Sequence, residues 1–166
     1  MANNDILIRL RYALDIKNVD MVEIFKLGGV TFTKEEVQKI LVKVKEEYDE
    51  NGNLIENDEQ LKVNNKTLEA FLNGFIVFKR GAQPGSEGPM PATGKESSNN
   101  MLLKKVKIAL QFTTEDILEL LYEGGVTVSK GELGAILRNP SHRNYKECGD
   151  KFARNFLKGL TMKYRD

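Results

Sequence analysis

The sequence has one cysteine, one histidine and no tryptophan. Cys148 has no second cysteine with which to form a disulfide inside the chain, so disulfide bonds do not hold this fold together. One cysteine and one histidine also supply too few ligands for a zinc site. We therefore expect no metal and no cofactor. We also expect a cytoplasmic protein, since the first residues lack the basic and apolar pattern of a secretory signal.

The sequence also lacks long apolar runs and an excess of either charge. Its longest apolar stretch, residues 70–78, is interrupted by Asn73 and Gly74, whereas a membrane-spanning helix needs ~20 apolar residues. The 25 basic and 24 acidic side chains leave a net charge of +1, so no overall field attracts nucleic acid. We expect no membrane contact and only local charged sites. What is present, 40% hydrophobic and 30% charged residues, is typical of a globular protein.

One sequence pattern occurs twice along the chain. When Asn4 is placed over Asn100, an offset of 96 residues, the register holds without a gap through three expected helices, and the Gly-Gly-Val-Thr of residues 28–31 recurs. A second block follows at an offset of 85 and places Gly74 over Gly159, so the first copy carries an insertion of 11 residues. Such internal repetition predicts two units of one fold.

The repeat divides the chain into three parts. The first unit covers residues 1–81 and contains the insertion, an acidic segment at about 46–62. Residues 82–99 are rich in proline, glycine and serine, which predicts a flexible linker. The second unit covers residues 100–166. Because units below ~70 residues rarely bury a sufficient core alone, we expect the two units to pack as one body.

Apolar residues recur at helical spacing in four segments of each copy. This predicts an all-α fold of two similar four-helix units packed about an approximate two-fold axis. Gly74 and Gly159 interrupt the fourth segments, and we expect them to allow close helix crossing between the two copies. The expected core of the first copy is Ile6, Leu7, Leu10, Ala13, Leu14, Met21, Ile24, Phe25, Val37, Ile40, Leu41, Val44, Leu68, Phe71, Leu72 and Phe75. That of the second copy is Leu102, Leu103, Val106, Ala109, Leu110, Ile117, Leu120, Leu121, Leu133, Ile136, Leu137, Phe152, Phe156, Leu157 and Leu160.

Start and stop signals mark the ends of several expected helices. A Ser or Thr followed three residues later by an acid has the spacing of a capping box. Paired glycines suit a helix end closed by a left-handed residue better than a phosphate loop, which would need a Lys followed by Ser or Thr. The capping pairs are Thr33 with Glu36, Thr113 with Asp116 and Ser129 with Glu132, and the glycine pairs are at 28–29 and 124–125.

Two further patterns suggest a function but have simpler explanations. A helix pair joined by a glycine turn resembles the DNA-binding helix-turn-helix, yet the third helix of the second copy offers a DNA groove only Lys130 and Arg138. The acidic insertion places Asp49 at a calcium-loop position, but its first and twelfth residues would be Glu47 and Asp58, which reverses the expected acid types. An ordinary helix pair and an exposed acidic loop explain these patterns better.

The carboxyl-terminal segment is the most basic part of the chain. From residue 138 onward it has eight Lys or Arg and three acids, with aromatic residues between them, which is typical of single-stranded nucleic-acid binding or of a solvated face. Its polar cluster at 140–150 lacks a full set of catalytic groups, since Asp150 is explained as a helix cap and Cys148 as a buried side chain. We expect no catalytic residue. The candidate binding residues are His142, Arg143, Asn144, Tyr145, Lys146, Glu147, Arg154, Lys79 and Arg80.

Residues in both copies also form a family pattern. They are Asn73-Gly74, Lys79-Arg80-Gly81, Asn99-Asn100, Leu103-Lys104-Lys105, Pro140, His142, Asn144, Glu147-Cys148-Gly149-Asp150, Phe152, Arg154, Phe156-Leu157 and Gly159-Leu160. By this pattern the chain resembles the YehS-like bacterial family, a tandem-repeat domain of unknown function. The resemblance spans nearly the whole chain and implies the repeated fold and a cytoplasmic bacterial setting. It implies no activity or substrate. Val63 and Asn65 stand where the first copy of a relative can carry Cys and Asp.

The sequence thus favours a non-enzymatic binding module for a protein partner. We expect it to use the surface formed by residues 138–154 together with Lys79 and Arg80, because two units offer two similar faces and no catalytic constellation is complete. The alternative is a nucleic-acid-binding protein, for RNA or DNA, that uses the same basic surface. A swapped or symmetric homodimer is also compatible with the repeat.

Overall fold

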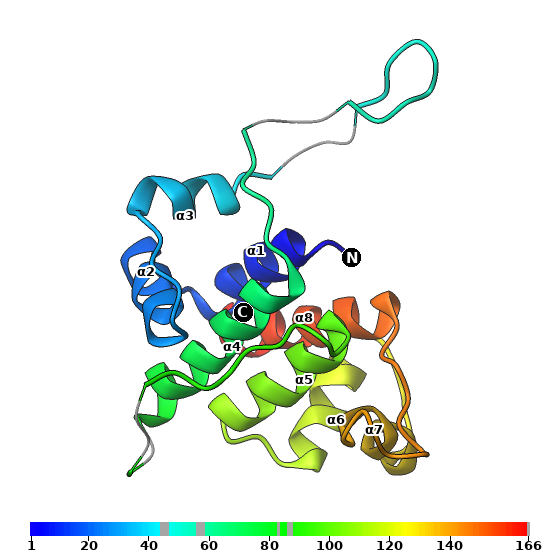
Figure 1. Ribbon diagram of the computed structural model, residues 1–166. Coiled ribbons are helices and arrows are strands. Elements are labelled where there is room, and N and C mark those ends of the chain that lie inside the picture. The colour runs from blue at the N-terminus through cyan, green and yellow to red at the C-terminus, as the bar shows by residue number, and fades with distance from the viewer. Residues whose placement is uncertain (44–46, 56–58, 83, 86–87, 166) are drawn as a thin grey trace.

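The computed structural model of the protein describes residues 1–43, 47–55, 59–82, 84–85 and 88–165. Across this part of the chain the regular secondary structure consists of helices and one bridge between Tyr48 and Leu54, so the predicted all-α class is confirmed (Figure 1). The eight helices of these residues are α1 (Asn3–Leu14), α2 (Asn18–Leu27), α3 (Lys34–Ile40), α4 (Asn65–Arg80), α5 (Ser98–Ala109), α6 (Thr114–Glu123), α7 (Lys130–Leu137) and α8 (Asp150–Arg165).

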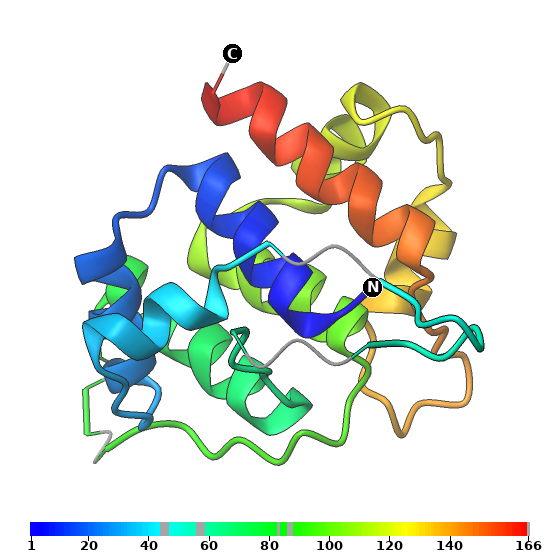
Figure 2. The ribbon, with the colours of Figure 1, turned by 90° about the horizontal axis from the view of Figure 1, so that it is seen from above.

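Each copy packs its first helix on the last helix of the other copy. α1 of the first copy lies on α8 of the second, and α5 of the second copy lies on α4 of the first. Within each copy the second helix packs on the fourth, α2 on α4 and α6 on α8. Because each of these contacts has its counterpart when the copies are interchanged, the two units are related by an approximate two-fold axis, as predicted (Figures 1 and 2).

The α1–α8 pair runs parallel. At one end the amino group of Met1, just before α1, lies 2.5 Å from the carboxylate of Asp150, the first residue of α8. At the other end Asp15, just after α1, pairs with Arg165 at 2.9 Å. The two helices therefore lie side by side along their whole length, with one end formed by both beginnings (Figure 2).

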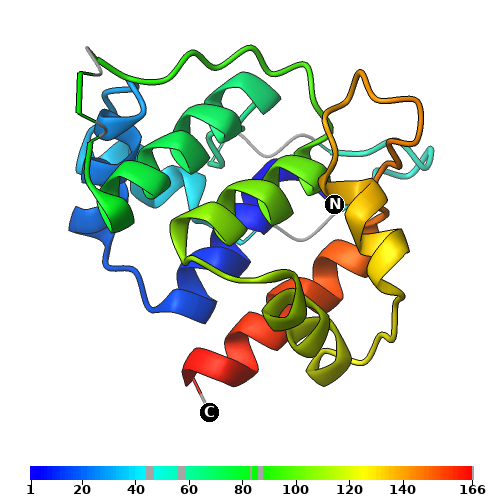
Figure 3. The same ribbon diagram turned by 90° about the horizontal axis from the view of Figure 1, so that it is seen from below.

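The α4–α5 pair is parallel as well, so the chain must return along α4 before α5 begins. Arg80, at the end of α4, donates to the carbonyl oxygen of Ile108 near the end of α5 at 3.5 Å. Residues 88–97 make the return beside α4, as Figure 3 shows. The Glu69 carboxylate holds this segment, since it accepts hydrogen bonds from the amides of Thr93 and Gly94 at 2.9 Å each.

One continuous hydrophobic core extends through both copies. Every predicted core residue that the structure describes is either buried or packed against this core, because apolar residues at helical spacing share one helix face. Partly buried at its edge are Leu14, Leu41, Leu110, Leu137 and Phe152, and Val44 lies outside the described residues. Core residues that the spacing did not predict are Ile16, Val63, Ala70, Met101, Phe112 and Ala153.

Gly74 and Gly159 do allow close helix crossings, but inside each copy. A Cβ atom at Gly74 would collide with the carbonyl oxygen of Ile24 in α2, and one at Gly159 would collide with that of Leu120 in α6. The prediction that these glycines lie between the copies was therefore wrong. Glycine in a helix signals a close backbone approach, but it does not reveal which helix approaches.

Helix ends follow the predicted signals in most cases. Thr33 and Thr113 each form a complete capping box with the acid three residues later. Ser129 accepts from the amide of Glu132, but the Glu132 carboxylate pairs with Lys146 at 3.4 Å, so only half of the third box forms among the described residues. In each glycine pair the second member takes the left-handed conformation, with φ of 93° at residue 29 and 103° at residue 125.

The insertion of the first copy projects away from the helices as an exposed arm, residues 47–55 (Figure 1). The Asp49 carboxylate accepts from the amides of Asn51 and Asn53 at 2.9 Å each, which closes the turn of the arm. Asp58 of the supposed calcium loop lies outside the described residues. Within the described part of the chain, no group of three His, Cys, Asp or Glu could hold a metal ion, and no helix is long and apolar enough to cross a membrane.

Candidate functional site

The polar segment at 140–150 is anchored by a buried asparagine. The Asn100 amide donates to the carbonyl oxygens of Ile136 at 3.1 Å and Lys146 at 2.9 Å, and its side-chain oxygen accepts from the amide of Cys148 at 2.8 Å. Asn100 is fully buried, so these bonds satisfy a polar group that would otherwise destabilise the core. The segment is thereby fixed between α7 and α8.

The same clamp is present in the first copy. Asn4 donates to the carbonyl oxygens of Ile40 at 3.0 Å and Leu61 at 2.8 Å, and it accepts from the amide of Val63 at 3.0 Å. Every atom of this arrangement has its counterpart at the repeat offset of 96 or 85 residues. Because both copies keep the clamp, it is a structural device of the repeat.

A second asparagine extends the clamp in each copy. Asn99 donates to the carbonyl oxygen of Cys148 at 3.0 Å and to the Asp150 carboxylate at 2.9 Å. In the first copy Asn3 donates in the same way to Val63 and Asn65. Asp150 is therefore the first residue of α8 and a partner of Asn99, and the prediction that it caps this helix was wrong.

The environment of Cys148 makes it unsuited to nucleophilic catalysis. The residue is 4% exposed, and burial, followed by the negative charge of Asp150, raises the pKa of its thiol to about 12. At neutral pH the sulfur stays protonated, whereas the thiolate is the nucleophilic form. The pKa of Asp150 is lowered in turn, because Met1 and Asn99 donate hydrogen bonds to its carboxylate.

Most of the candidate binding residues in the α7–α8 connection are exposed. His142, Arg143, Asn144, Lys146 and Glu147 are all exposed. Tyr145 is partly buried, with the Lys104 ammonium 5.3 Å from its ring centre. Burial, and then the charge of Glu96, raises the pKa of Tyr145 to about 12.

Lys79 and Arg80 lie away from this connection. Arg80 contacts Ile108 near the end of α5, whereas the connection is bonded to Asn100 near the beginning of α5. Eight residues of helix at ~1.5 Å each separate these two positions by roughly 12 Å. The structure therefore corrects the expectation that Lys79 and Arg80 lie adjacent to residues 138–154.

Arg154 lines a groove between α1 and α8, which we call the α1–α8 groove. It has a volume of about 830 Å³. Four of its lining residues are basic: Arg9 from α1, Arg154 and Lys158 from α8, and Lys43 from the segment after α3, so both copies contribute. The remaining lining residues are Asp5, Ile8, Tyr12, Asn155 and Thr161.

The basic side chains of the α1–α8 groove are available to a ligand. Arg9, Lys43, Arg154 and Lys158 are exposed, and none of the four forms an ion pair with another described residue. Tyr12, 53% exposed, adds an aromatic ring at one end of the groove. The guanidinium of Arg165 lies 4.3 Å from the centre of this ring and pairs with Asp15, so the ring is held in place.

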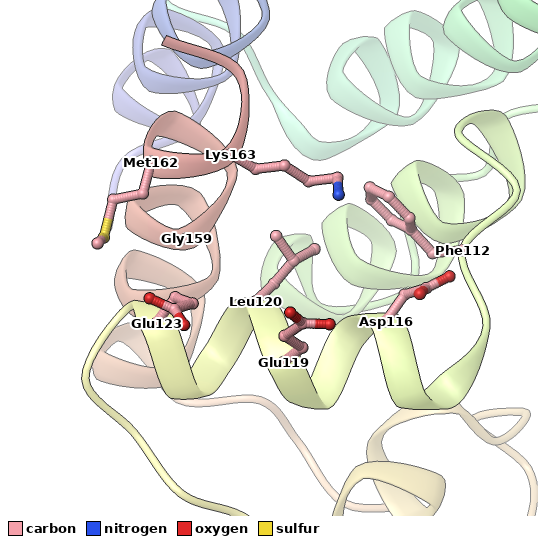
Figure 4. A pocket seen from close by; sticks show the side chains of 8 residues that line it. All are labelled: Phe112, Asp116, Glu119, Leu120, Glu123, Gly159, Met162 and Lys163. Atoms are coloured by element: carbon pink, nitrogen blue, oxygen red, sulfur yellow. The ribbon is translucent and has the colours of Figure 1, made fainter. Parts of the chain in front are cut away.

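A smaller pocket lies between α6 and α8. Its volume is about 270 Å³, and Figure 4 shows Asp116, Glu119 and Glu123 along one face of α6, with Lys163 reaching from α8. Asp116 already accepts from the amide of Thr113 at 2.8 Å in its capping box. That hydrogen bond, more than any other influence, lowers the pKa of Asp116, so one of the three acids serves helix capping.

Comparison with known proteins agrees with the repeated architecture. The model of a family described as a protein of unknown function (DUF1456) matches residues 3–81 and 99–166. The chain belongs to the DUF1456 family. "Uncharacterized protein YehS" of Escherichia coli (strain K12) is 38% identical over 163 residues, which cover 98% of this chain and 96% of that protein. No solved structure matches the chain. The YehS-like resemblance is thus confirmed, and the DUF1456 matches fall on the two packed copies.

Arg9, Lys43 and Tyr12 were not predicted from the sequence to belong to a binding site. These residues lie in the first copy, far along the chain from the basic segment that drew attention to Arg154. The repeat register was the one signal available, but it does not reveal that the first helix of one copy packs on the last helix of the other.

Proposed function

We propose that the protein is a non-enzymatic helical binding module that engages an acidic region of a protein partner through the α1–α8 groove. The observation that carries the proposal is the convergence of Arg9, Lys43, Arg154 and Lys158 on one groove without ion-pair partners among the described residues. Like charges repel one another, so such a group is stabilised when an anionic ligand enters.

The same charges set the expected strength and salt dependence. A single exposed ion pair contributes about 0–1 kcal/mol, so one lysine would not make a site. Several cations along one groove act together on a partner with several carboxylates, and their attraction weakens as salt screens it over about 10 Å at 0.1 M. Binding should therefore be multivalent and sensitive to salt.

A nucleic acid is the second candidate ligand, and Tyr12 is the observation that favours it. Its exposed ring lies beside Arg165 at one end of the basic groove, where a base of a single strand could stack while phosphates meet the cations. The net charge of +1 argues against this candidate, because nucleic-acid-binding domains are usually strongly basic.

Fluorescence anisotropy with labelled probes tests both candidates. The probes are a glutamate-rich peptide, a random single-stranded RNA and a duplex DNA, each at low and moderate salt. The groove variant is Arg154→Glu with Lys158→Glu. The matched control is Arg143→Glu with Lys151→Glu, which makes the same charge change at exposed residues that do not line the groove.

We expect the peptide to bind, and the groove variant to weaken binding at least about tenfold, or about 1.4 kcal/mol. The control variant should retain binding. Groove-dependent binding of RNA or DNA without the peptide would establish the nucleic-acid function in its place. Absence of peptide binding even at low salt would show the proposal to be wrong.

A further inference from the structure

The α1–α8 groove has an internal counterpart between α4 and α5. The repeat offset of 96 relates α1 to α5, and the offset of 85 relates α4 to α8. Both pairs are parallel and both join the two copies. Each helix residue that lines one groove therefore has an equivalent position in the other groove.

The α4–α5 groove is occupied by an extended segment of the chain itself. Residues 88–97 run beside α4, and the Glu69 carboxylate accepts from two consecutive backbone amides of this segment, at Thr93 and Gly94. On the α5 side, the Lys104 ammonium lies 2.6 Å from the carboxylate of Glu96. The segment is thus held by a side chain of each helix.

Two pairs of equivalent positions differ in exposure between the grooves. Asn73 of α4 is 2% exposed, whereas its counterpart on α8, Lys158, is exposed. Met101 of α5 is fully buried, whereas its counterpart on α1, Asp5, is exposed. The α1–α8 groove therefore has the same framework, and it is open to solvent at Asp5 and Lys158.

The two grooves differ in the hydrogen-bonding groups that they offer. Arg154 stands at the position of Glu69, and Lys158 stands at the position of Asn73. A carboxylate accepts hydrogen bonds from backbone amides, but a guanidinium and an ammonium can only donate. At these two positions an occupant of the α1–α8 groove must therefore present acceptors, and carboxylates satisfy both the hydrogen bonds and the charge.

We infer that the α1–α8 groove binds an extended acidic segment of a protein partner, laid along α8 as residues 88–97 are laid along α4. This inference rests on the proposed function and adds the conformation of the ligand. α8 has 16 residues, so at ~1.5 Å each it is roughly 24 Å long. At ~3.3 Å per extended residue, a bound segment of about seven residues spans it.

Two peptides of about eight residues and equal negative charge test the conformation with the full chain. One alternates glutamate with proline, which keeps it extended. The other combines glutamate with alanine and is closed into a helix by a side-chain bridge. We expect the extended peptide to bind at least about tenfold more tightly and to shift the amide resonances of residues 150–165 in NMR spectra.

A charge exchange separates recognition from a general loss of folding. The variant Arg154→Glu with Lys158→Glu should no longer bind the extended acidic peptide. It should instead bind the peptide in which every glutamate is replaced by lysine. A misfolded variant would bind neither peptide. A folded groove that holds the segment by charge should instead change its preference from the acidic to the basic peptide.

Each other outcome overturns the inference. Equal affinity for the helical peptide would leave the proposed function standing but would refute the extended conformation. Binding of neither peptide would refute both. A dimer of the full chain that disappears with Glu47→Gln, Asp49→Asn and Glu50→Gln would assign the groove to the acidic arm of a second copy.

Discussion

At the residue scale, buried asparagines explain how the polar segment at residues 140–150 is held in place. Asn4 and Asn100 each satisfy three backbone groups and fix the segment that precedes the last helix of their copy. The polar cluster at residues 140–150 is therefore largely structural around Cys148. Only side chains of this segment that form no part of the asparagine clamp are free to contact a ligand.

Replacing Asn100 with alanine should destabilise the fold strongly. The change leaves the carbonyl oxygens of Ile136 and Lys146 and the amide of Cys148 without their partner, and each unsatisfied buried group costs about 1–3 kcal/mol. We expect a loss of at least about 3 kcal/mol in urea unfolding. Asn144→Ala, at an exposed position of the same connection, should cost less than about 0.5 kcal/mol. Equal effects of the two substitutions would contradict the clamp.

Asp116 should make stability depend on pH in the acidic range. Its hydrogen bonds with Thr113 lower its folded pKa below the unfolded value, so its contribution is present above the unfolded pKa and is lost as pH falls through the folded pKa. Asp116→Asn keeps an acceptor for Thr113 but removes the titration. Thermal midpoints measured between about pH 5 and pH 2 should therefore fall less steeply for the variant. Parallel curves would exclude this role.

At the element scale, helical periodicity predicted the helices and the core but not the partners of each helix. The spacing of Leu7 and Leu10 shows one buried face of α1, yet nothing in that spacing distinguishes α8 from α4 as its neighbour. For the same reason Gly74 was assigned to the wrong crossing. The α1–α8 groove could not be predicted, because Arg9 and Arg154 meet only through this pairing.

Glycine substitutions should have opposite effects at two helical positions. Gly159→Ala places a methyl group against the carbonyl oxygen of Leu120, so we expect a loss of more than about 2 kcal/mol on thermal unfolding. Gly134→Ala, in α7, meets open space and should stabilise the protein by up to about 1 kcal/mol through helix propensity. A neutral Gly159→Ala would show that α6 and α8 can separate without loss.

At the scale of the whole molecule, neither copy contains all the contacts of its own helices. α1 finds its main partner in α8 and α5 finds its main partner in α4, so the core continues from one copy into the other. Small units depend strongly on such shared burial, because a short chain covers only part of its apolar surface.

Separated halves should fold only together. Expressed alone, residues 1–81 expose the faces of α1 and α4 that contact the second copy, and we expect no cooperative melting by circular dichroism. Mixed with residues 96–166, they should regain helical signal and a sharp transition at a concentration-dependent midpoint. Independent cooperative melting of residues 1–81 would disprove this mutual dependence.

The return path beside α4 has a topological consequence. One segment joins the two copies, but there are two equivalent parallel helix pairs, α1–α8 and α4–α5. Within residues 1–166, only the α4–α5 pair is therefore connected by a segment of the chain. In a circular permutant, a segment that joins residue 166 to residue 1 must return along α8 from its end to its beginning, as residues 88–97 return along α4.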